Sequence, residues 1–159
     1  MDELLIMKIQ DTVEKYGKER EFLIPILKKI QKINKYNYIP QEVSQYLAKY
    51  MQLKESEVYE VISFYAEFSE TPRGENVIKV CDNTVCRVNN NNKTVKVLES
   101  LLSIKMGETT PDKKFSLEYS PCFGACDISP AMRINGKIYG NLDKKSLKEI
   151  IEYYQEVEL

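Results

Sequence analysis

Apolar residues recur every three or four positions through much of the first 72 residues, with polar residues between them. This spacing aligns apolar side chains along one side of a helix. It predicts four helices: over residues 4–16 and 22–33, from Pro40 onward, and after an N-cap at Ser56. The expected inward-facing residues are Leu5, Ile9 and Val13; Leu23, Ile26, Leu27 and Ile30; Val43, Tyr46, Leu47 and Tyr50; and Val58, Val61, Ile62 and Tyr65, with Phe64 and Phe68 at a second edge. Their short connections predict a helical bundle.

The pattern changes after the turn-forming segment Thr71-Pro72-Arg73-Gly74. We therefore expect a boundary here, with a helical bundle over residues 1–72 and a second domain over residues 73–159. Four β-branched or alternating runs predict strands at residues 76–80, 115–119, 131–134 and 137–139, and Asn135-Gly136 predicts a hairpin turn. Apolar stripes predict helices at residues 94–106 and 142–154, whereas the asparagine run 89–92 is expected to be a loop. The expected fold class is α+β or α/β, a helical bundle followed by a sheet layered with helices.

Charge and hydropathy exclude several classes of protein. The formal net charge is −1 and the basic residues are spread along the chain, so a nucleic-acid-binding footprint is missing. No apolar run approaches the ~20 residues that span a bilayer, so direct membrane insertion is not expected. Acidic residues stand near the N-terminus where a signal peptide would carry basic ones. We therefore expect a cytoplasmic protein.

The sequence contains no histidine. This excludes a Ser-His-Asp or Cys-His nucleophile, a His-ligated zinc site, a Rieske cluster and a haem with a proximal histidine. Soft metal ligands must then be cysteines, and the chain has four: Cys81, Cys86, Cys122 and Cys126. Because the cytosol keeps thiols reduced, these four residues indicate metal binding or thiol chemistry more than structural disulfides.

The cysteine spacing leaves three alternatives. Four residues separate Cys81 from Cys86, thirty-five lie between the two pairs, and three separate Cys122 from Cys126. Zinc ribbons usually have two residues within each pair and a shorter gap. The Cys-X-X-Cys spacing that lowers a thiol pKa is also absent. The pattern favours an iron–sulfur cluster and leaves open a structural four-cysteine zinc module without a redox role, or thiol–disulfide chemistry.

Each cysteine pair follows a predicted strand, so both pairs are expected in loops whose backbone N–H groups can turn toward sulfur. Gly124 lies between Cys122 and Cys126, where the missing side chain would let the backbone approach a cluster. Several apolar or stiff neighbours would keep water away. They are Pro121, Phe123, Ala125, Ile128 and Pro130.

Motifs in both halves resemble one family. In the second half these are Cys81-x-x-Thr84-x-Cys86, Gly107-Glu108-Thr109-Thr110-Pro111-Asp112-x-x-Phe115, Cys122-Phe123-Gly124-Ala125-Cys126, Pro130 and Asn135. In the first half they are Leu23-Ile24-Pro25-Ile26-Leu27, Tyr38-Ile39-Pro40 and Glu57-Val58-Tyr59-x-Val61-x-x-Phe64-Tyr65. They resemble the thioredoxin-like [2Fe-2S] subunits of respiratory complex I, NAD(P)-linked [FeFe]-hydrogenases and formate dehydrogenases.

The resemblance implies a thioredoxin-like domain over residues 73–159 and one [2Fe-2S] cluster. Cys81 and Cys86 would bind one iron, and Cys122 and Cys126 the other. It implies an electron-transfer subunit without catalytic residues of its own, belonging to an NAD(P)H-linked oxidoreductase. The parent would be a soluble [FeFe]-hydrogenase-type complex, with electron bifurcation as one form, or the NADH-dehydrogenase module of complex I. FMN and NAD(P) would bind to the partner flavoprotein, with the helical half as a docking surface.

One segment departs from the family pattern. After its second cysteine the family usually shows an apolar residue and soon a glycine, whereas this chain has Arg87-Val88-Asn89-Asn90. Asparagine is the residue that best replaces glycine in a left-handed backbone conformation, so the loop is expected to keep its shape. Arg87 would raise the reduction potential if its charge acts on the cluster, and would have no effect as a solvated surface residue.

Overall fold

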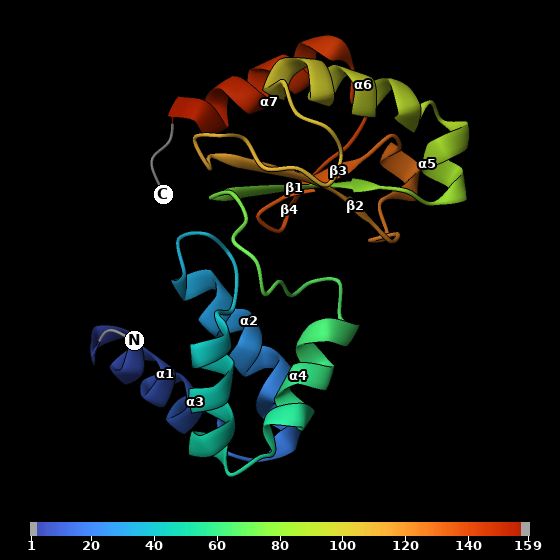
Figure 1. Ribbon diagram of the computed structural model, residues 1–159. Coiled ribbons are helices and arrows are strands. Elements are labelled where there is room, and N and C mark those ends of the chain that lie inside the picture. The colour runs from blue at the N-terminus through green and yellow to red at the C-terminus, as the bar shows by residue number, and fades with distance from the viewer. Residues whose placement is uncertain (1–2, 157–159) are drawn as a thin grey trace. The chain divides into compact units, whose positions relative to one another are not determined.

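The computed structural model describes residues 3–156 of the chain. The chain divides into two compact units, one ending at Pro72 and the other beginning at Arg73 (Figure 1). The first unit is helical and the second contains a four-stranded sheet. The mixed α+β class expected from the sequence is confirmed.

The helical unit contains four α-helices and one 3₁₀ turn among its described residues. They are α1 (Glu3–Tyr16), η1 (Arg20–Phe22), α2 (Leu23–Ile33), α3 (Gln41–Met51) and α4 (Glu55–Phe64). Gly17 ends α1 with a φ of 108° and donates its N–H to the Val13 carbonyl at 2.8 Å, so the predicted stop is confirmed.

The predicted apolar stripes form the core of this unit. Its fully buried side chains include Ile9, Val13, Leu23, Ile26, Leu27, Ile30, Val43, Leu47, Val58 and Ile62. The expectation for Phe64 is wrong, since 80% of this residue is exposed. It follows Ile62 by two positions, and helical residues two apart point to different faces. Tyr65 is also exposed at 43%, because the helix ends before it, whereas Phe68 is buried as expected.

The residues predicted to begin the third helix and to cap the fourth are each displaced by one or two positions. Pro40 is the N-cap of α3 and not its first helical residue, with an extended ψ of 148°. The fourth helix is capped at Lys54 and not at Ser56, because the Glu57 carboxylate accepts the Lys54 N–H at 3.0 Å. This bond satisfies an N–H group at the start of the helix.

The sheet of the second unit has the strand order β2-β1-β3-β4. Its strands are β1 (Asn76–Cys81), β2 (Phe115–Ser120), β3 (Met132–Ile134) and β4 (Lys137–Tyr139). The β1–β2 pair is parallel, whereas the other two pairs are antiparallel. Asn135 and Gly136 join β3 to β4 with φ values of 50° and 93°, as the hairpin prediction requires. All four predicted strands are present to within one residue at each end.

The helices of this unit are α5 (Thr84–Val88), α6 (Asn91–Leu102) and α7 (Lys144–Glu156). Helices α6 and α7 cover one face of the sheet, and α5 lies at its end (Figure 1). Leu98 of α6 and Ile151 of α7 join Ile78, Leu117 and other sheet residues in one core.

Two predictions for this layer are wrong. The helix expected at residues 94–106 begins at Asn91 and ends at Leu102, where Ser103 adopts a left-handed φ of 55°. The asparagine run is therefore partly helical and not a loop throughout. The short helix α5 was not expected, because five residues are too few for an apolar period to be recognised.

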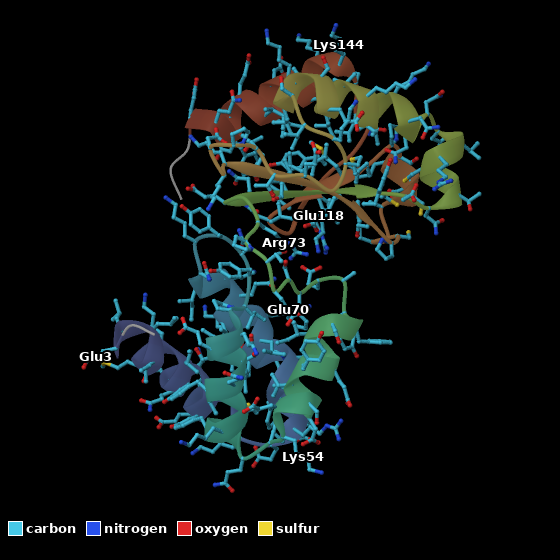
Figure 2. All side chains as sticks on the ribbon, viewed as in Figure 1. Glu3, Lys54, Glu70, Arg73, Glu118 and Lys144 are labelled. Atoms are coloured by element: carbon cyan, nitrogen blue, oxygen red, sulfur yellow. The ribbon has the colours of Figure 1, made fainter. Side chains whose placement is uncertain are left out.

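The second unit also contains an ion pair on β2. The Arg73 Nε donates to a Glu118 carboxylate oxygen at 2.7 Å (Figure 2), and the Arg73 side chain is only 10% exposed. The Gly74 N–H donates to the Ser116 hydroxyl at 2.7 Å. These bonds attach the start of the unit to its edge strand.

Candidate metal centre

The sheet brings the two cysteine pairs together beside the carboxyl ends of β1 and β2. Strands β1 and β2 run parallel, and Cys81 at the end of β1 lies opposite Ser120 at the end of β2. Cys122 follows two residues after Ser120, so both chain segments leave the sheet at their carboxyl ends. Cys86 lies on α5, and Cys126 begins the 3₁₀ turn η2 (Cys126–Ile128). The expectation that both pairs occupy loops is therefore wrong for the first pair, which belongs to a strand and a helix.

All four cysteines are free thiols that interact with one another. The Sγ atoms of Cys122 and Cys126 are 3.5 Å apart. The Cys86 and Cys122 thiols lie near enough to Cys81 to affect its pKa. Within residues 3–156, no group of three or more His, Cys, Asp or Glu side chains is arranged to hold a metal ion. The structure nevertheless gathers the predicted residues, and four neighbouring thiols are the donor set that a [2Fe-2S] cluster requires.

Burial differs sharply between the pairs. Cys81 and Cys86 are 2% and 1% exposed, whereas Cys122 is exposed and Cys126 is half-buried. Burial raises the pKa of the Cys81 thiol to about 11. The Gly124 N–H instead lowers the pKa of Cys122. The hydrogen bond with Cys122 raises the pKa of Cys126, so Cys122 is the thiol of that pair that ionises first.

Gly124 has a definite role in the second loop. Its φ is 85°, and its N–H points at the Cys122 Sγ at an N–S distance of 3.4 Å. A Cβ at this position would meet no atom within 4 Å. Glycine is therefore needed here for its left-handed backbone, which turns the N–H toward sulfur as predicted.

The apolar surround expected at the second loop is incomplete. Ala125 is buried, and Phe123, Ile128 and Pro130 are half-buried, but Pro121 is exposed. The Arg133 guanidinium lies 5.7 Å from the Phe123 ring centroid, within reach of a cation–π contact. This side of the site is open to solvent and not sealed by apolar groups.

Arg87 is paired and not isolated. Its Nε and Nη2 donate to the two carboxylate oxygens of Asp82 at 2.7 and 2.8 Å. This bond to Arg87 lowers the pKa of Asp82. The Arg87 side chain stays 62% exposed, so its charge is both matched by a carboxylate and screened by water.

The asparagine run holds residues that the sequence did not identify as part of the site. Asn90 has the left-handed conformation expected of a glycine substitute, with a φ of 65°. The Asn91 Nδ2 donates to the Cys81 carbonyl at 2.6 Å, and the Asn89 Nδ2 donates to the Ser129 hydroxyl at 2.9 Å. In the sequence, only the replacement of the family's glycine by asparagine pointed to this segment. No spacing rule predicts the contacts of Asn89 and Asn91.

Comparison with known proteins identifies the family of the chain. A sequence model of the thioredoxin-like [2Fe-2S] ferredoxin family matches residues 9–155. The NADP-reducing hydrogenase subunit HndA of Solidesulfovibrio fructosivorans is 33% identical over 150 residues, covering 94% of this chain and 86% of that protein. A subunit of the NADH-quinone oxidoreductase of Aquifex aeolicus is 36% identical over 152 residues, covering 96% of this chain and 94% of that protein.

Solved structures share the fold. A chain in the crystal structure of an NAD+-reducing [NiFe]-hydrogenase in its H2-reduced state aligns with a TM-score of 0.76 at 22% identity. The alignment covers 89% of this chain but only 24% of the hydrogenase chain. None of the helices in residues 3–156 is long and apolar enough to cross a membrane. With its family motifs, its four gathered thiols and a match over nearly its whole length, the chain belongs to the thioredoxin-like [2Fe-2S] ferredoxin family.

Proposed function

We propose that this chain is the [2Fe-2S]-carrying electron-transfer subunit of a multisubunit, NAD(P)H-linked flavin and iron–sulfur oxidoreductase. The observation that carries the proposal is the meeting of four thiols, two from the end of β1 and the helix after it and two from the loop after β2, beside the carboxyl ends of these parallel strands. Cys81 and Cys86 bind one iron, and Cys122 and Cys126 bind the other. When bound, the cluster accepts and releases one electron at a time.

The protein's own residues hold the site. The exposed Cys122 keeps the second pair near the surface, where an electron partner can approach. The Gly124 N–H stabilises negative charge on the Cys122 sulfur. The chain has no histidine, and no proton transfer at this site is required for electron transfer. Hydride chemistry with NAD(P)H takes place on a partner flavoprotein that binds FMN.

Relatives named as subunits of an NADP-reducing hydrogenase and of NADH-quinone oxidoreductase support both parent complexes. The parent is a soluble hydrogenase-type complex, bifurcating or not, or the NADH-dehydrogenase module of complex I. We place the chain in the cytoplasm, with this module on the cytoplasmic side.

The first test is the composition of the anaerobically purified chain. We expect two irons and two acid-labile sulfides per chain, with an electron paramagnetic resonance (EPR) signal that appears on reduction. A colourless protein with one zinc and no labile sulfide would overturn the proposal in favour of a structural zinc module with four cysteine ligands.

We propose that the partner flavoprotein docks on α4 and the residue that follows it. Phe64, Tyr59 and Tyr65 are 80%, 55% and 43% exposed there. Phe64 and Tyr65 line a shallow hollow with Glu60, Val61 and Ser63. Residues 55–70 contain five glutamates and no lysine or arginine, although the whole chain has a net charge of only −1. The surface therefore fits a flavoprotein face that is apolar at its centre and basic at its rim.

A matched pair of variants tests this docking. Tyr59→Ala should weaken binding to the co-purified flavoprotein roughly tenfold or more, as loss of an interfacial aromatic does. Tyr153→Ala is the control, because Tyr153 on α7 is 56% exposed and Tyr59 is 55% exposed. Equal binding by both variants, measured by surface plasmon resonance, would exclude the α4 surface as the contact.

A further inference from the structure

We infer that Asn91 is a positioning residue for the cluster, acting through the backbone of Cys81. The inference depends on the proposed ligand set. Asn91 is the first residue of α6 and Cys81 is the last residue of β1. The Asn91 Nδ2 donates to the Cys81 carbonyl at 2.6 Å, across ten residues of sequence. The bond therefore closes the base of a loop that contains both cysteines of the first pair.

The orientation of the Asn91 amide is set by its surroundings. Exchanging its nitrogen and oxygen would place two acceptor oxygens 2.6 Å apart, so the nitrogen must face Cys81. The Oδ1 atom is then buried, and it has no hydrogen-bond partner in the part of the chain that the structure describes. A buried acceptor left unpaired is unfavourable for folding. Fold stability alone therefore does not explain why an asparagine occupies this position.

Two other polar contacts hold the same loop, but both are exposed to water. Asp82 directly follows Cys81, Arg87 directly follows Cys86, and the two form a salt bridge in which the Arg87 side chain is 62% exposed. Asn89 bonds to Ser129 across to the second loop, also at an exposed site. Solvent weakens such contacts. Asn91 is 1% exposed, so its bond is shielded and holds the loop most firmly.

The bond affects the cluster through geometry. The Cys81 N–H is placed by the Ala131 carbonyl at 3.4 Å, and Asn91 restrains the carbonyl at the other end of the same residue. With both ends held, the Cys81 sulfur has a defined position for iron. Partners that orient a metal ligand typically change metal affinity by about 10- to 100-fold when they are removed.

The test compares Asn91→Leu with Asn92→Leu in the purified, cluster-loaded chain. Asn92 is the next residue of the same helix and is exposed, so the control makes the same chemical change outside the site. We expect Asn91→Leu to release iron to a chelator about 10- to 100-fold faster and to shift the EPR signal and the reduction potential. Asn92→Leu should leave all three unchanged.

A purely structural role gives a different result. If Asn91→Leu lowers the melting temperature but leaves iron release, EPR signal and potential as in the unmodified chain, measured well below melting where both chains stay folded, the inference is wrong. Should Asn91→Leu not fold, Asn91→Ser is used, which is smaller and too short to keep the bond. Its release rate must rise in the same direction. Failure of the proposed function is distinguishable, because the unmodified chain would then lack the [2Fe-2S] signal.

Discussion

The two cysteine pairs serve the same proposed cluster, yet they occupy unlike surroundings. Cys81 ends β1, which has neighbours on both sides in the sheet, whereas Cys122 follows β2, which is an edge strand. Cys81 is 2% exposed, Cys86 on α5 is 1% exposed, and Cys122 is exposed. One side of the site is built into the sheet and helix layer, and the other is an open surface loop.

The difference suggests separate tasks for the two pairs. The buried pair is held by a strand, a short helix and Asn91, so we expect it to fix the position of the cluster. The exposed loop relies on Gly124 and places its sulfur atoms where a redox partner can approach. We expect electrons to enter and leave on the Cys122 side.

The largest expected effect comes from removing a ligand. Cys86→Ser and Cys122→Ser should each lose or severely destabilise the cluster and so change the EPR signal, because iron–sulfur clusters are held by thiolates and a serine oxygen is a harder ligand. Cys86→Ser should also lower fold stability by roughly 1–3 kcal/mol, since it buries a hydroxyl at a 1% exposed position. Asp82→Asn, beside Cys81 but not a ligand, should keep the cluster. An unaltered spectrum and potential in Cys122→Ser would refute the ligand assignment.

The second prediction concerns thiol reactivity in the metal-free chain. Iodoacetamide should modify Cys122 before Cys81 and Cys86, by at least about tenfold in rate, because thiolates react and Cys122 is exposed. Since the Gly124 N–H lowers the pKa of Cys122, its rate should level off below the pH at which an ordinary thiol does. Burial raises the pKa of Cys81 to about 11, so its rate should still be rising at alkaline pH where the Cys122 rate is constant. Mass spectrometry of the labelled peptides checks the order, and equal rates would contradict the contrast in burial.

The third prediction separates backbone strain from the effect on sulfur. Gly124→Ala forces alanine into a φ of 85° at a cost of about 1–2 kcal/mol, without a steric clash. Gly107→Ala is the matched control, since its φ is 90° and a Cβ there also meets no atom within 4 Å. Both variants should lose similar stability in thermal unfolding. Only Gly124→Ala should change the reduction potential, and a shift of equal size in both would assign the effect to strain alone.

The smallest expected effect belongs to the exposed salt bridge. Arg87→Ala leaves the Asp82 carboxylate unmatched and should lower the reduction potential by at most a few tens of millivolts, because water screens an exposed pair. Asp82→Asn should raise the potential by a similar amount, and the double variant should restore it. Protein-film voltammetry at low salt measures these shifts, which salt should reduce. No shift in either single variant would show that Arg87 acts as a solvated surface residue.

Local patterns in the sequence were sufficient to predict most of the helices and strands. Helical stripes such as Ile9 and Val13, the Asn135-Gly136 turn and the run into Cys81 depend on neighbours close in sequence, so periodicity and turn chemistry predicted them. Prediction failed where particular side-chain contacts or short length decided the outcome. The Glu57 carboxylate places the cap of the fourth helix at Lys54, and α5 is too short to show a period.

For the site, the sequence alone determined the four thiols, the absence of histidine and the place of Gly124, because each is a matter of residue type and spacing. It could not determine which pair is buried, because exposure depends on which strand lies at the sheet edge. Nor could it identify Asn91, whose bond to Cys81 exists only once α6 packs beside the end of β1. Strand order and helix packing are properties of the folded chain, and they divide the cysteines into a buried pair and an exposed loop.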